Sequence, residues 1–431
     1  MTIKKKFFFF ILRLILILKL HFFYAVLIIL YSRRVHDSKK SKQKVLVFSK
    51  SGGSHDIKSS IETGLIHKNI YEINRDIIKF TYRFFVDNLD GEQFEHLDSV
   101  YKKKSIKYYN FLMSSFSYLK KIWYLRIIIG FNVFFRPEIE IQKASRDLGI
   151  KFICCHKEGV SSTNYNKIID DITKKMKIKF HGDKILLYNQ NTKNSLSNIK
   201  ITESKKMIVI GCSRADKQFK FKEKRKFNQE FKKIIFFIMP EFSILPSSKW
   251  MYIKNKKLTH ENNKLINWNR YNLETAKALI RAAKKFNNKI HITFKDKIGS
   301  HNISVEKLVN KSKMNNLTYL NSGNSDYLIQ DSDIVLASYS TTTFESIASG
   351  ACVLENKIGI SKSSKILKYK FDYKNQFQAV KNYNDLETNI RKSFKKSNIK
   401  KNNSSKVKKL LKDYIGNNDG KSSIKLAKEI R

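Results

Sequence analysis

Three hydroxyl side chains stand between a short apolar segment and a run of helical spacing in the last third of the chain. Residues 334–337 read Ile-Val-Leu-Ala, which predicts a strand buried on both faces. Ser340, Thr341 and Thr342 follow at the start of the predicted helix, and Glu345 lies one turn further on. Backbone N–H groups, the helix dipole and hydroxyls at a helix start can hold a phosphate, and a carboxylate can accept hydrogen bonds from a ribose. The alternative is that the Ser/Thr run merely caps the helix.

The wider segment from Ser332 to Gly350 resembles the donor-site segment of two-Rossmann (GT-B) glycosyltransferases. It is most similar to enzymes that build bacterial surface polysaccharides and glycerophosphate polymers. The resemblance implies that residues 340–342 lie by the donor diphosphate and that Glu345 meets the nucleotide ribose. It also implies an enzyme without a cofactor or metal ion, in which the nucleotide-sugar is a substrate, because dipoles and hydroxyls can bear the diphosphate charge.

A second part of the resemblance lies at residues 211–216, Gly-Cys-Ser-Arg-Ala-Asp. This turn is similar to the Gly-x-x-Arg-x-Asp turn that ends the N-terminal domain of GT-B enzymes. It follows a predicted strand at 207–210, so the resemblance implies that Arg214 reaches the cleft between the domains and pairs with phosphate of the donor. An ion pair between Arg214 and Asp216 that fixes the hinge is equally open.

Two loops in the first half of the chain each follow a predicted strand. Gly52 and Gly53 lie in the first loop, which in the resembled family often faces the acceptor, although a glycine pair also makes an ordinary turn. His156 and Glu158 lie in the second loop, at the end of a strand, where open α/β sheets bind ligands. An inverting sugar transfer needs a base for the acceptor hydroxyl, so Glu158, ahead of His156, is a candidate catalytic base. Both side chains could instead lie on a surface loop and have no role in catalysis.

Composition indicates a folded and strongly basic protein. The 431 residues include 85 Lys and Arg against 37 Asp and Glu, a formal net charge of +48, and 42% of them are hydrophobic. Taken alone, this charge suggests a nucleic acid or an anionic membrane as partner. However, Lys is spread along the whole chain together with Asn and Ile, a bias that an AT-rich genome produces. Because the sequence also lacks a recognition helix or zinc finger, we predict no nucleic-acid partner.

The residues that commonly bind metals show no convincing arrangement. The four cysteines, at positions 154, 155, 212 and 352, form no C-x-x-C pair, so we predict neither a disulfide framework nor a zinc site. A reducing, cytoplasmic environment fits this pattern. Asp331-Ser332-Asp333 has the spacing of a metal-binding Asp-x-Asp motif, but it precedes the predicted strand on the side away from the cleft. We therefore predict no metal site.

The N-terminus is intensely hydrophobic between residues 7 and 31, and Arg13, Lys19 and His21 interrupt it. A charge at mid-bilayer is costly, which weakens a spanning helix, and the basic residues on both sides leave the orientation undecided. A helix lying flat in the interface would let both flanks meet anionic lipid. We predict attachment to the cytoplasmic face of a membrane, either by spanning or by lying on it.

Together these features predict an α/β protein with two Rossmann-like domains facing a cleft and an N-terminal hydrophobic membrane segment. The expected parts are a membrane segment with a basic linker (1–40), an acceptor domain (41–220), a nucleotide-donor domain (221–385) and a basic helical tail (386–431). In GT-B folds a final helix crosses back to the N-terminal domain, and a helix of this tail is a candidate for it. The predicted activity is transfer of a sugar from a nucleotide-activated donor to a surface-polysaccharide or lipid-linked acceptor.

Three alternatives stay open at this point. A glycerophosphate or polyol-phosphate transferase would use the same fold and the same donor turn. A nucleotide-sugar epimerase shares the fold but does not need the hydrophobic N-terminus. A non-enzymatic basic scaffold that binds membrane or nucleic acid is the third, and its binding would weaken steeply with salt.

Overall fold

The structure is a computed structural model, and it divides the chain into two compact units, described one at a time below. Unit 1 comprises described residues up to 214 together with 421–431, and unit 2 comprises described residues from 215 to 420. The residues that the structure describes are 3–50, 52–86, 99–157, 178–225, 230–239, 268–297, 300–337, 340–360, 377–395, 405–417 and 419–431.

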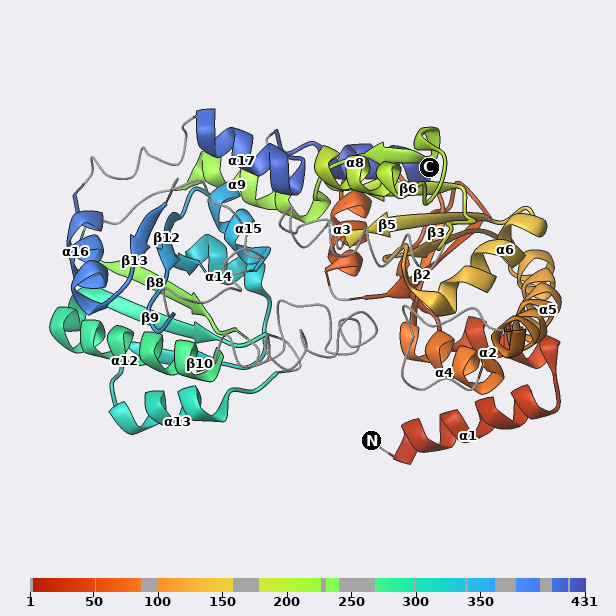
Figure 1. Ribbon diagram of the computed structural model, residues 1–431, viewed down its shortest axis with the longest axis horizontal. Helices are drawn as coiled ribbons and strands as arrows, with labels where there is room; N and C mark the ends of the chain where they lie inside the picture. Colours follow the sequence, from red (N-terminus) through yellow and green to blue (C-terminus); the bar gives the residue numbers. More distant parts are fainter. Residues whose placement is uncertain are drawn as a thin grey trace. The chain divides into compact units, whose positions relative to one another are not determined.

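Unit 1 is built on a sheet of seven strands in the order β1-β3-β2-β4-β5-β6-β7 (Figure 1). β1 is antiparallel to β3, and every other neighbouring pair is parallel. The chain runs from β2 outward to β3 and then returns to the other side of β2 as β4, so the winding direction changes between β2 and β4. The strands are β1 Arg33–His36, β2 Lys44–Ser49, β3 Asn69–Asn74, β4 Leu125–Gly130, β5 Lys151–His156, β6 Lys184–Leu187 and β7 Met207–Val209.

Helices cover both faces of this sheet. The apolar residues of α3 and α18 pack with strand residues such as Val47 and Ile127 in one core cluster. α2 packs against α5, and α4 against α5 and β3. The helices are α1 Ile3–Ile17, α2 His21–Tyr31, α3 Gly53–Ile61, α4 Arg75–Val86, α5 Ser99–Ile122, α6 Ile139–Asp147, α8 Gln190–Asn198 and α18 Ser422–Ile430.

Unit 2 has a sheet of six parallel strands in the order β10-β9-β8-β11-β12-β13. The chain winds from β8 outward to β10, then returns beside β8 as β11 and winds the other way. This is the 3-2-1-4-5-6 order of a Rossmann fold, with its switch point between β8 and β11. The strands are β8 Lys232–Phe237, β9 Ile290–Lys295, β10 Leu317–Leu320, β11 Ile334–Ala337, β12 Cys352–Asn356 and β13 Gln378–Val380.

The core of unit 2 lies under α12, whose apolar side packs with α13, α16 and the strands. The spacing of Ala276, Leu279 and Ala283 predicts this side, and all three residues are fully buried. α14 and α15 contact α9, and α15 also contacts α17. The helices are α9 Asp216–Lys224, α12 Trp268–Phe286, α13 Ile303–Ser312, α14 Ser325–Asp331, α15 Thr342–Ala348, α16 Tyr383–Ser393 and α17 Ser405–Ile415.

The hydrophobic N-terminus differs from the single membrane segment that we expected. The chain turns at Lys19, whose φ is +51°, and this turn separates α1 from α2. Each helix buries one side in unit 1: Leu12 is fully buried, and the Tyr24 hydroxyl hydrogen-bonds Thr81 Oγ1 at 3.1 Å. Within the described ranges, no helix has the length and apolarity needed to cross a membrane.

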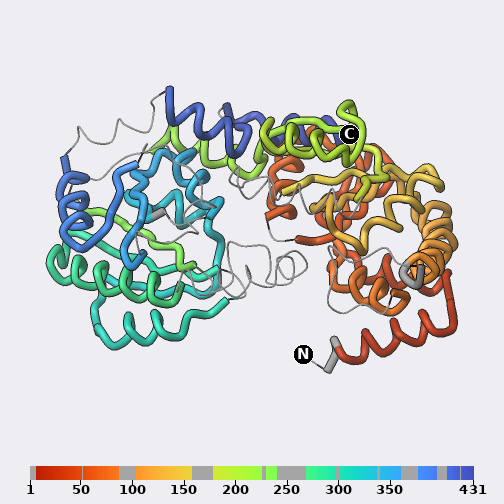
Figure 2. Tube along the Cα trace, viewed as in Figure 1, coloured from red at the N-terminus to blue at the C-terminus, as the bar shows by residue number. Residues whose placement is uncertain are grey.

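The predicted C-terminal tail is divided between the units. α16 and α17 belong to unit 2, whereas α18 belongs to unit 1. Leu426 and Ile430 of α18 are fully buried in the core cluster that contains Ile57 of α3, and Figure 2 shows the C-terminal end of the chain within this unit. The helix that the GT-B resemblance leads us to expect back on the N-terminal domain is therefore α18.

Candidate functional site

The hydroxyl-rich turn of unit 2 lies at the switch point of its sheet. It follows β11, one of the two strands between which the winding direction changes. In open α/β sheets, ligands bind outside the carboxyl ends of the strands at this point. Thr341 is the N-cap residue of α15, and Glu345 is buried within that helix at 5% exposure. The topology thus brings together Ser340, Thr341, Thr342 and Glu345, the residues that the sequence singled out.

The turn keeps hydroxyl groups available while its backbone is held firmly. Thr341 and Thr342 are half-buried, and in the described part of the chain neither side chain makes a hydrogen bond. Ser340 Oγ accepts only a long bond, 3.4 Å, from the Thr342 N–H. α15 is anchored by Phe344, a fully buried ring stacked on Tyr414 of α17 with 4.7 Å between centroids. Apart from the long bond to Ser340 Oγ, the hydroxyls at positions 340–342 make no capping hydrogen bond within the described residues, so ligand binding stays a prediction for this turn.

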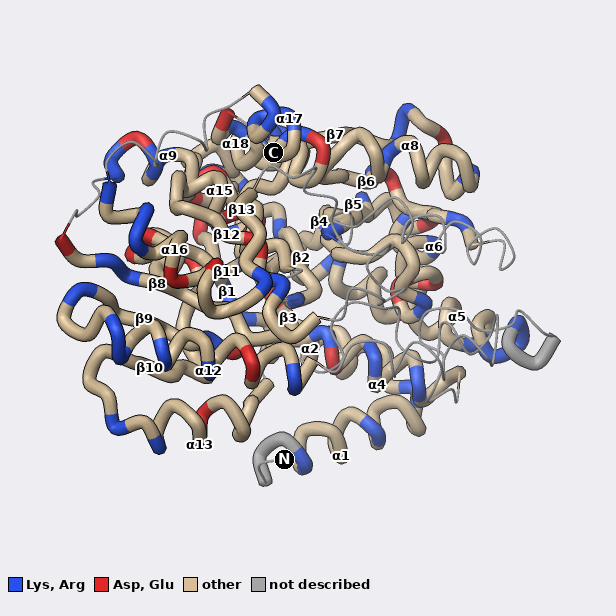
Figure 3. Tube along the Cα trace, turned by 60° about the vertical axis from the view of Figure 1, so that its left-hand side comes forward, with Lys and Arg blue, Asp and Glu red and all other residues tan. Residues whose placement is uncertain are grey.

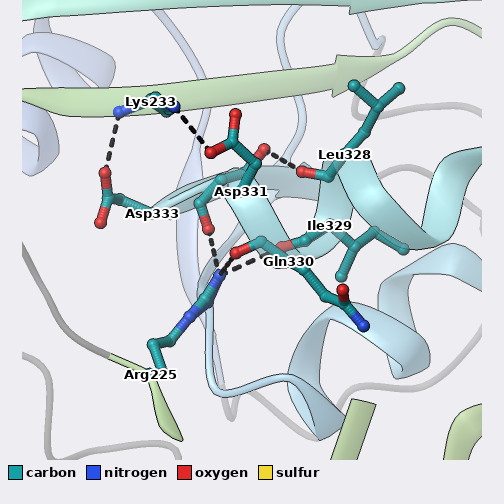
Figure 4. A network of polar contacts seen from close by, with 8 residues as sticks. Arg225, Lys233, Leu328, Ile329, Gln330, Asp331 and Asp333 are labelled. Carbon is teal, nitrogen blue, oxygen red and sulfur yellow. Dashed lines mark hydrogen bonds and ion pairs between the residues drawn. The ribbon is translucent and has the colours of Figure 1, made fainter. Parts of the chain in front are cut away.

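The Asp-x-Asp triplet lies at the other end of β11 and is engaged in structural contacts (Figure 4). The Lys233 Nζ lies 2.6 Å from Asp331 Oδ1, and the Lys233 N–H donates to Asp333 Oδ2 at 2.9 Å. Arg225 donates to carbonyl groups left open at the end of α14, those of Ile329 (3.1 Å), Gln330 (2.9 Å) and Ser332 (2.6 Å). The described residues contain no group of three or more His, Cys, Asp or Glu that could hold a metal ion.

The switch-point side of unit 1 carries a buried charged cluster made of Asp56, Tyr188 and Arg214. The Arg214 N–H donates to Asp56 Oδ1 at 2.9 Å, and its Nη1 lies 3.3 Å from Asp56 Oδ2 and 2.8 Å from the Tyr188 hydroxyl. The Tyr188 hydroxyl in turn donates to Asp56. Burial raises the pKa of Tyr188 well above its usual value, so the phenol stays protonated. Asp56 is thus the carboxylate that holds the Arg214 guanidinium.

The first glycine of the predicted acceptor loop lies against this cluster. Gly52 has φ +81°, a conformation that favours glycine, and a Cβ added there would lie 3.3 Å from Arg214 Nη1. The same Cβ would lie 3.8 Å from Lys157 Nζ. Two cationic groups from different loops therefore converge beside the backbone of Gly52. Gly53 is equally constrained, because a Cβ there would overlap the Phe131 ring.

The second predicted loop is described only in part. Glu158 lies outside the described residues, and His156 is buried at the end of β5. The Val133 N–H donates to His156 Nδ1 at 3.4 Å. A neutral ring whose Nδ1 accepts this long bond carries its proton on Nε2, where it can donate a hydrogen bond.

A second buried ion pair supports the same end of the sheet. Arg75, which follows β3, has its Nη2 3.0 Å from Glu138 Oε1, and the Glu138 side chain is fully buried. Burial raises the pKa of Glu138, and the charges of Arg75 and Lys50 oppose that effect. A Cβ on Gly130 would overlap the Glu138 carboxylate, so the residue that ends β4 has to be glycine. The pair ties the loops after β3 and β4 together.

A cavity of about 520 Å³ lies beside α3, on the side of the helix that faces β1. Its floor is apolar, with Val47 and Ile61 among the lining residues, and Arg33, Lys58 and Glu72 are among its charged ones. Arg33 Nη2 and Glu72 Oε2 are 2.8 Å apart, and Ser54 also donates to Glu72. The first turn of α3 therefore lies between this cavity and the Arg214 cluster.

Comparison with known proteins bears on the fold. No family model matches the sequence, and no curated protein matches it. The wall teichoic acid polymerase TagF is similar in structure, with a TM-score of 0.52 at 10% identity over 90% of this chain and 88% of that chain. The fold is of the GT-B type. The expected pair of Rossmann-like α/β domains is thereby confirmed.

UDP-GlcNAc 2-epimerases also align along most of the chain. The enzyme from Neisseria meningitidis, bound to UDP-GlcNAc, aligns with a TM-score of 0.47 at 12% identity, over 90% of this chain and 99% of that one. At this level the likeness is too weak to bear on the reaction of this chain.

Asp56, Lys157 and Tyr188 are candidate site residues that sequence reasoning missed. Asp56 lies four residues after Gly52 in the first turn of α3, and Tyr188 directly follows β6. Their positions at strand ends were a usable signal for a ligand-binding edge. Their pairing with Arg214 could not be read from the sequence, because Asp56 lies 158 residues before Arg214.

Proposed function

We propose that this protein transfers a glycosyl group from a nucleotide-activated donor to a hydroxyl group of a glycan or lipid-linked acceptor. The observation that carries the proposal is the position of the Ser340–Thr342 turn at the switch point of unit 2, with its hydroxyls uncommitted. The GT-B fold supports it, since that fold places donor sites in a Rossmann-like unit of this kind.

In this proposal unit 2 binds the donor. Thr341, Thr342 and Ser340 donate hydrogen bonds to the diphosphate, and Glu345 accepts hydrogen bonds from the ribose. Hydrogen bonds to charged groups are stronger than neutral ones, so the diphosphate gains most from these donors. The reaction needs no further cofactor, because the activated donor supplies both the transferred group and the leaving group.

Unit 1 binds the acceptor side of the reaction. The loop with Gly52 and Gly53 lets the acceptor approach the backbone closely, and Arg214, with Lys157 beside it, offers positive charge to the phosphate of the donor. Asp56 and Tyr188 act as positioning residues, because they hold the guanidinium in place. The base that takes the proton of the acceptor hydroxyl is Glu158 or His156, of which the hydrogen bond to His156 Nδ1 favours Glu158.

Glycerophosphate transfer is the second candidate. TagF is a wall teichoic acid polymerase, and a TagF variant soaked with CDPG aligns with a TM-score of 0.50 at 9% identity over 90% of this chain and 88% of that one. The same unit 2 turn would hold the diphosphate of CDP-glycerol. The two reactions differ in the bond that breaks: sugar transfer releases a nucleoside diphosphate, whereas glycerophosphate transfer from CDP-glycerol releases CMP.

Calorimetric titration of the full chain with UDP, GDP, CDP and CMP tests the proposal. We expect selective binding of one nucleotide and at least tenfold weaker binding by Glu345→Ala, because a hydrogen bond to a charged group contributes about 1.5–3 kcal/mol. Glu306→Ala is the matched control, since Glu306 lies on α13 and pairs with His301 at 2.7 Å. No selective binding, or binding indifferent to Glu345, would refute the donor site. In a separate transfer assay, release of CMP from CDP-glycerol would favour the second candidate.

A further inference from the structure

The hydrophobic N-terminus leaves a large apolar surface uncovered in unit 1. Of seventeen exposed large hydrophobic residues in the described part of the chain, ten lie between residues 7 and 31. Monomeric soluble proteins rarely expose large contiguous apolar patches, so a concentration of this kind marks an interaction surface. The ten residues are Phe7, Phe10, Leu14, Ile17, Leu18, Leu20, Phe22, Phe23, Leu30 and Tyr31.

α1 is apolar on two opposite sides. Its inner side is buried in unit 1 and includes Leu12 and Leu16, at 0% and 1% exposure. Its outer side carries apolar residues at positions 7, 10, 14 and 17, which is the spacing of one helical stripe, and they are 43% to 64% exposed. A helix that only needed to pack on this unit would be polar on its outer side. The outer stripe therefore indicates a second apolar environment.

Aromatic contacts extend this surface from α2 to the end of α5. The ring of Phe22 lies 5.6 Å from that of Tyr118, centroid to centroid, and both are exposed. Ile122 and Tyr124 are also exposed, at 47% each. At the other end of the α1–α2 hairpin, Tyr31 lies 4.0 Å from the ring of Phe8. We call the ten hairpin residues together with Tyr118, Ile122 and Tyr124 the hairpin face.

The segment that forms the α1–α2 hairpin carries charge of one sign. Residues 1–36 contain seven Lys and Arg and no Asp or Glu, the first acidic residue being Asp37. Lys6, Arg13 and Lys19 are exposed along the two helices, and Figure 3 shows Lys and Arg on α1. Interleaved apolar and basic residues of this kind are typical of helices that lie in the interface of an anionic membrane.

We propose that the hairpin face docks α1 and α2 flat onto an anionic lipid surface, such as the cytoplasmic leaflet of a membrane. The apolar stripe enters the acyl boundary, and the cations meet the lipid phosphates. The inner sides of both helices stay on unit 1, where Tyr24 remains hydrogen-bonded to Thr81. A spanning arrangement would have to strip those buried residues from their core. A second copy of the chain fits the face poorly, because the exposed cations Lys6, Arg13 and Lys19 of one copy would meet the same cations of the other.

Vesicle flotation of the full chain tests this docking. We expect the protein to float with vesicles of phosphatidylglycerol and phosphatidylcholine, to bind pure phosphatidylcholine at least tenfold more weakly, and to lose binding as salt rises. The triple substitution Phe7→Gln, Phe10→Gln and Leu14→Gln should weaken binding at least tenfold. Its matched control is Ile303→Gln with Tyr327→Gln, two residues of unit 2 that are 53% and 72% exposed. Circular dichroism confirms that both variants fold.

Equal binding to both kinds of vesicle, or equal loss in the control, would overturn the proposal. So would a dimer in lipid-free sedimentation that the triple substitution makes monomeric. Lys19→Cys in a Cys352→Ser background reports the topology, because Cys352 is only partly buried whereas Cys154, Cys155 and Cys212 are buried. In sealed vesicles we expect an impermeant thiol reagent to label position 19 from the side that carries the rest of the protein, and protection from that side would contradict a flat arrangement. None of these readouts depends on the transfer reaction, so docking and activity can fail separately.

Discussion

In unit 1 the cluster beside Gly52 carries charged side chains that are already paired, whereas in unit 2 the turn after β11 carries Thr341 and Thr342 hydroxyl groups that make no hydrogen bond within the described residues. Asp56 and Arg214 are 3% and 8% exposed and hold each other through two contacts. Thr341 and Thr342 are half-buried and make no side-chain hydrogen bond within the described ranges. Both sheets have a switch point, but the chemistry placed at each differs.

The two groups of residues therefore have different roles: those of unit 1 fix the position of a side chain, and those of unit 2 remain able to bind a ligand. A buried ion pair contributes little net stability, yet removing one partner is costly because the other charge is left without compensation. The unit 1 cluster therefore fixes where the Arg214 guanidinium lies. Hydroxyls without partners in the protein cost the fold little and remain able to bind a ligand. We expect substitutions in unit 1 to change stability and activity together, and substitutions in the unit 2 turn to change ligand binding alone.

Removal of the Asp56 carboxylate should have the largest effect. Asp56→Ala leaves Arg214 buried without its carboxylate and Tyr188 without its acceptor, which should cost about 3–5 kcal/mol of unfolding free energy. Urea denaturation followed by circular dichroism measures this loss. Glu203→Ala is the control, because the Glu203–Lys205 pair is exposed and its removal should leave the midpoint unchanged. A loss below 1 kcal/mol in Asp56→Ala would mean that the cluster does not hold the loop.

The acceptor loop offers a comparison between two glycines. Gly52 and Gly64 both have positive φ, +81° and +72°, so alanine at either position should cost about 1–2 kcal/mol. Of these two glycines, only Gly52 would place its added Cβ near a cation, 3.3 Å from Arg214 Nη1. A Cβ added at Gly64 would have no atom within 4 Å. Gly52→Ala should therefore also lower the transfer rate, and Gly64→Ala should not. Equal rates in the two variants would remove Gly52 from the acceptor site.

Loss of single hydroxyls from the turn should separate binding from stability. Thr341→Val and Thr342→Val remove groups that make no hydrogen bond in the described structure, so the unfolding free energy should change by less than about 0.5 kcal/mol. Nucleotide affinity should fall about tenfold or more, because a hydrogen bond to the charged diphosphate contributes about 1.5–3 kcal/mol. Calorimetry and denaturation on the same samples measure both. A loss of stability with unchanged nucleotide affinity would mean that these hydroxyls stabilise the fold and do not bind the nucleotide.

A smaller effect concerns acid stability of unit 1. Burial, with help from Lys143 and Arg146, lowers the pKa of His181 to about 4. The folded state therefore favours the neutral imidazole, and its stability is full above pH 6.5 and falls as the pH drops from 6.5 towards 4. His181→Gln should flatten the decline of the melting temperature between pH 7.5 and 5. The exposed His301, changed to Gln, is the control, and an unchanged decline in His181→Gln would contradict the assignment.

Much of the framework was predictable from local pattern. The short apolar runs at 44–48, 151–155 and 334–337 are strands in the structure, and the amphipathic spacing of α12 marks its buried side. Buried parallel strands and amphipathic helices can be predicted from the pattern of a few consecutive residues. The turn before Glu345 could be predicted for the same reason, since its strand, its hydroxyls and its helix are adjacent in sequence.

The rest depends on contacts between distant residues. β1 was missed because Arg33–His36 is polar and becomes a strand only by pairing with β3 at the edge of the sheet. The carboxylate that holds Arg214 lies 158 residues away, whereas the sequence offered only the nearby Asp216, as one of two open alternatives. The expected membrane segment is two helices because the chain turns at Lys19 and half of each helix finds an apolar partner in unit 1.

Hydrogen exchange of the full chain with and without the preferred nucleotide is the most direct test of the central claim, that unit 2 binds the donor at its hydroxyl-rich turn. We predict that saturating nucleotide slows exchange in peptides that cover residues 340–348, and that Glu345→Ala reduces this protection. Protection confined to the loop and helix at residues 52–61 of unit 1, or no protection in either region, would contradict it.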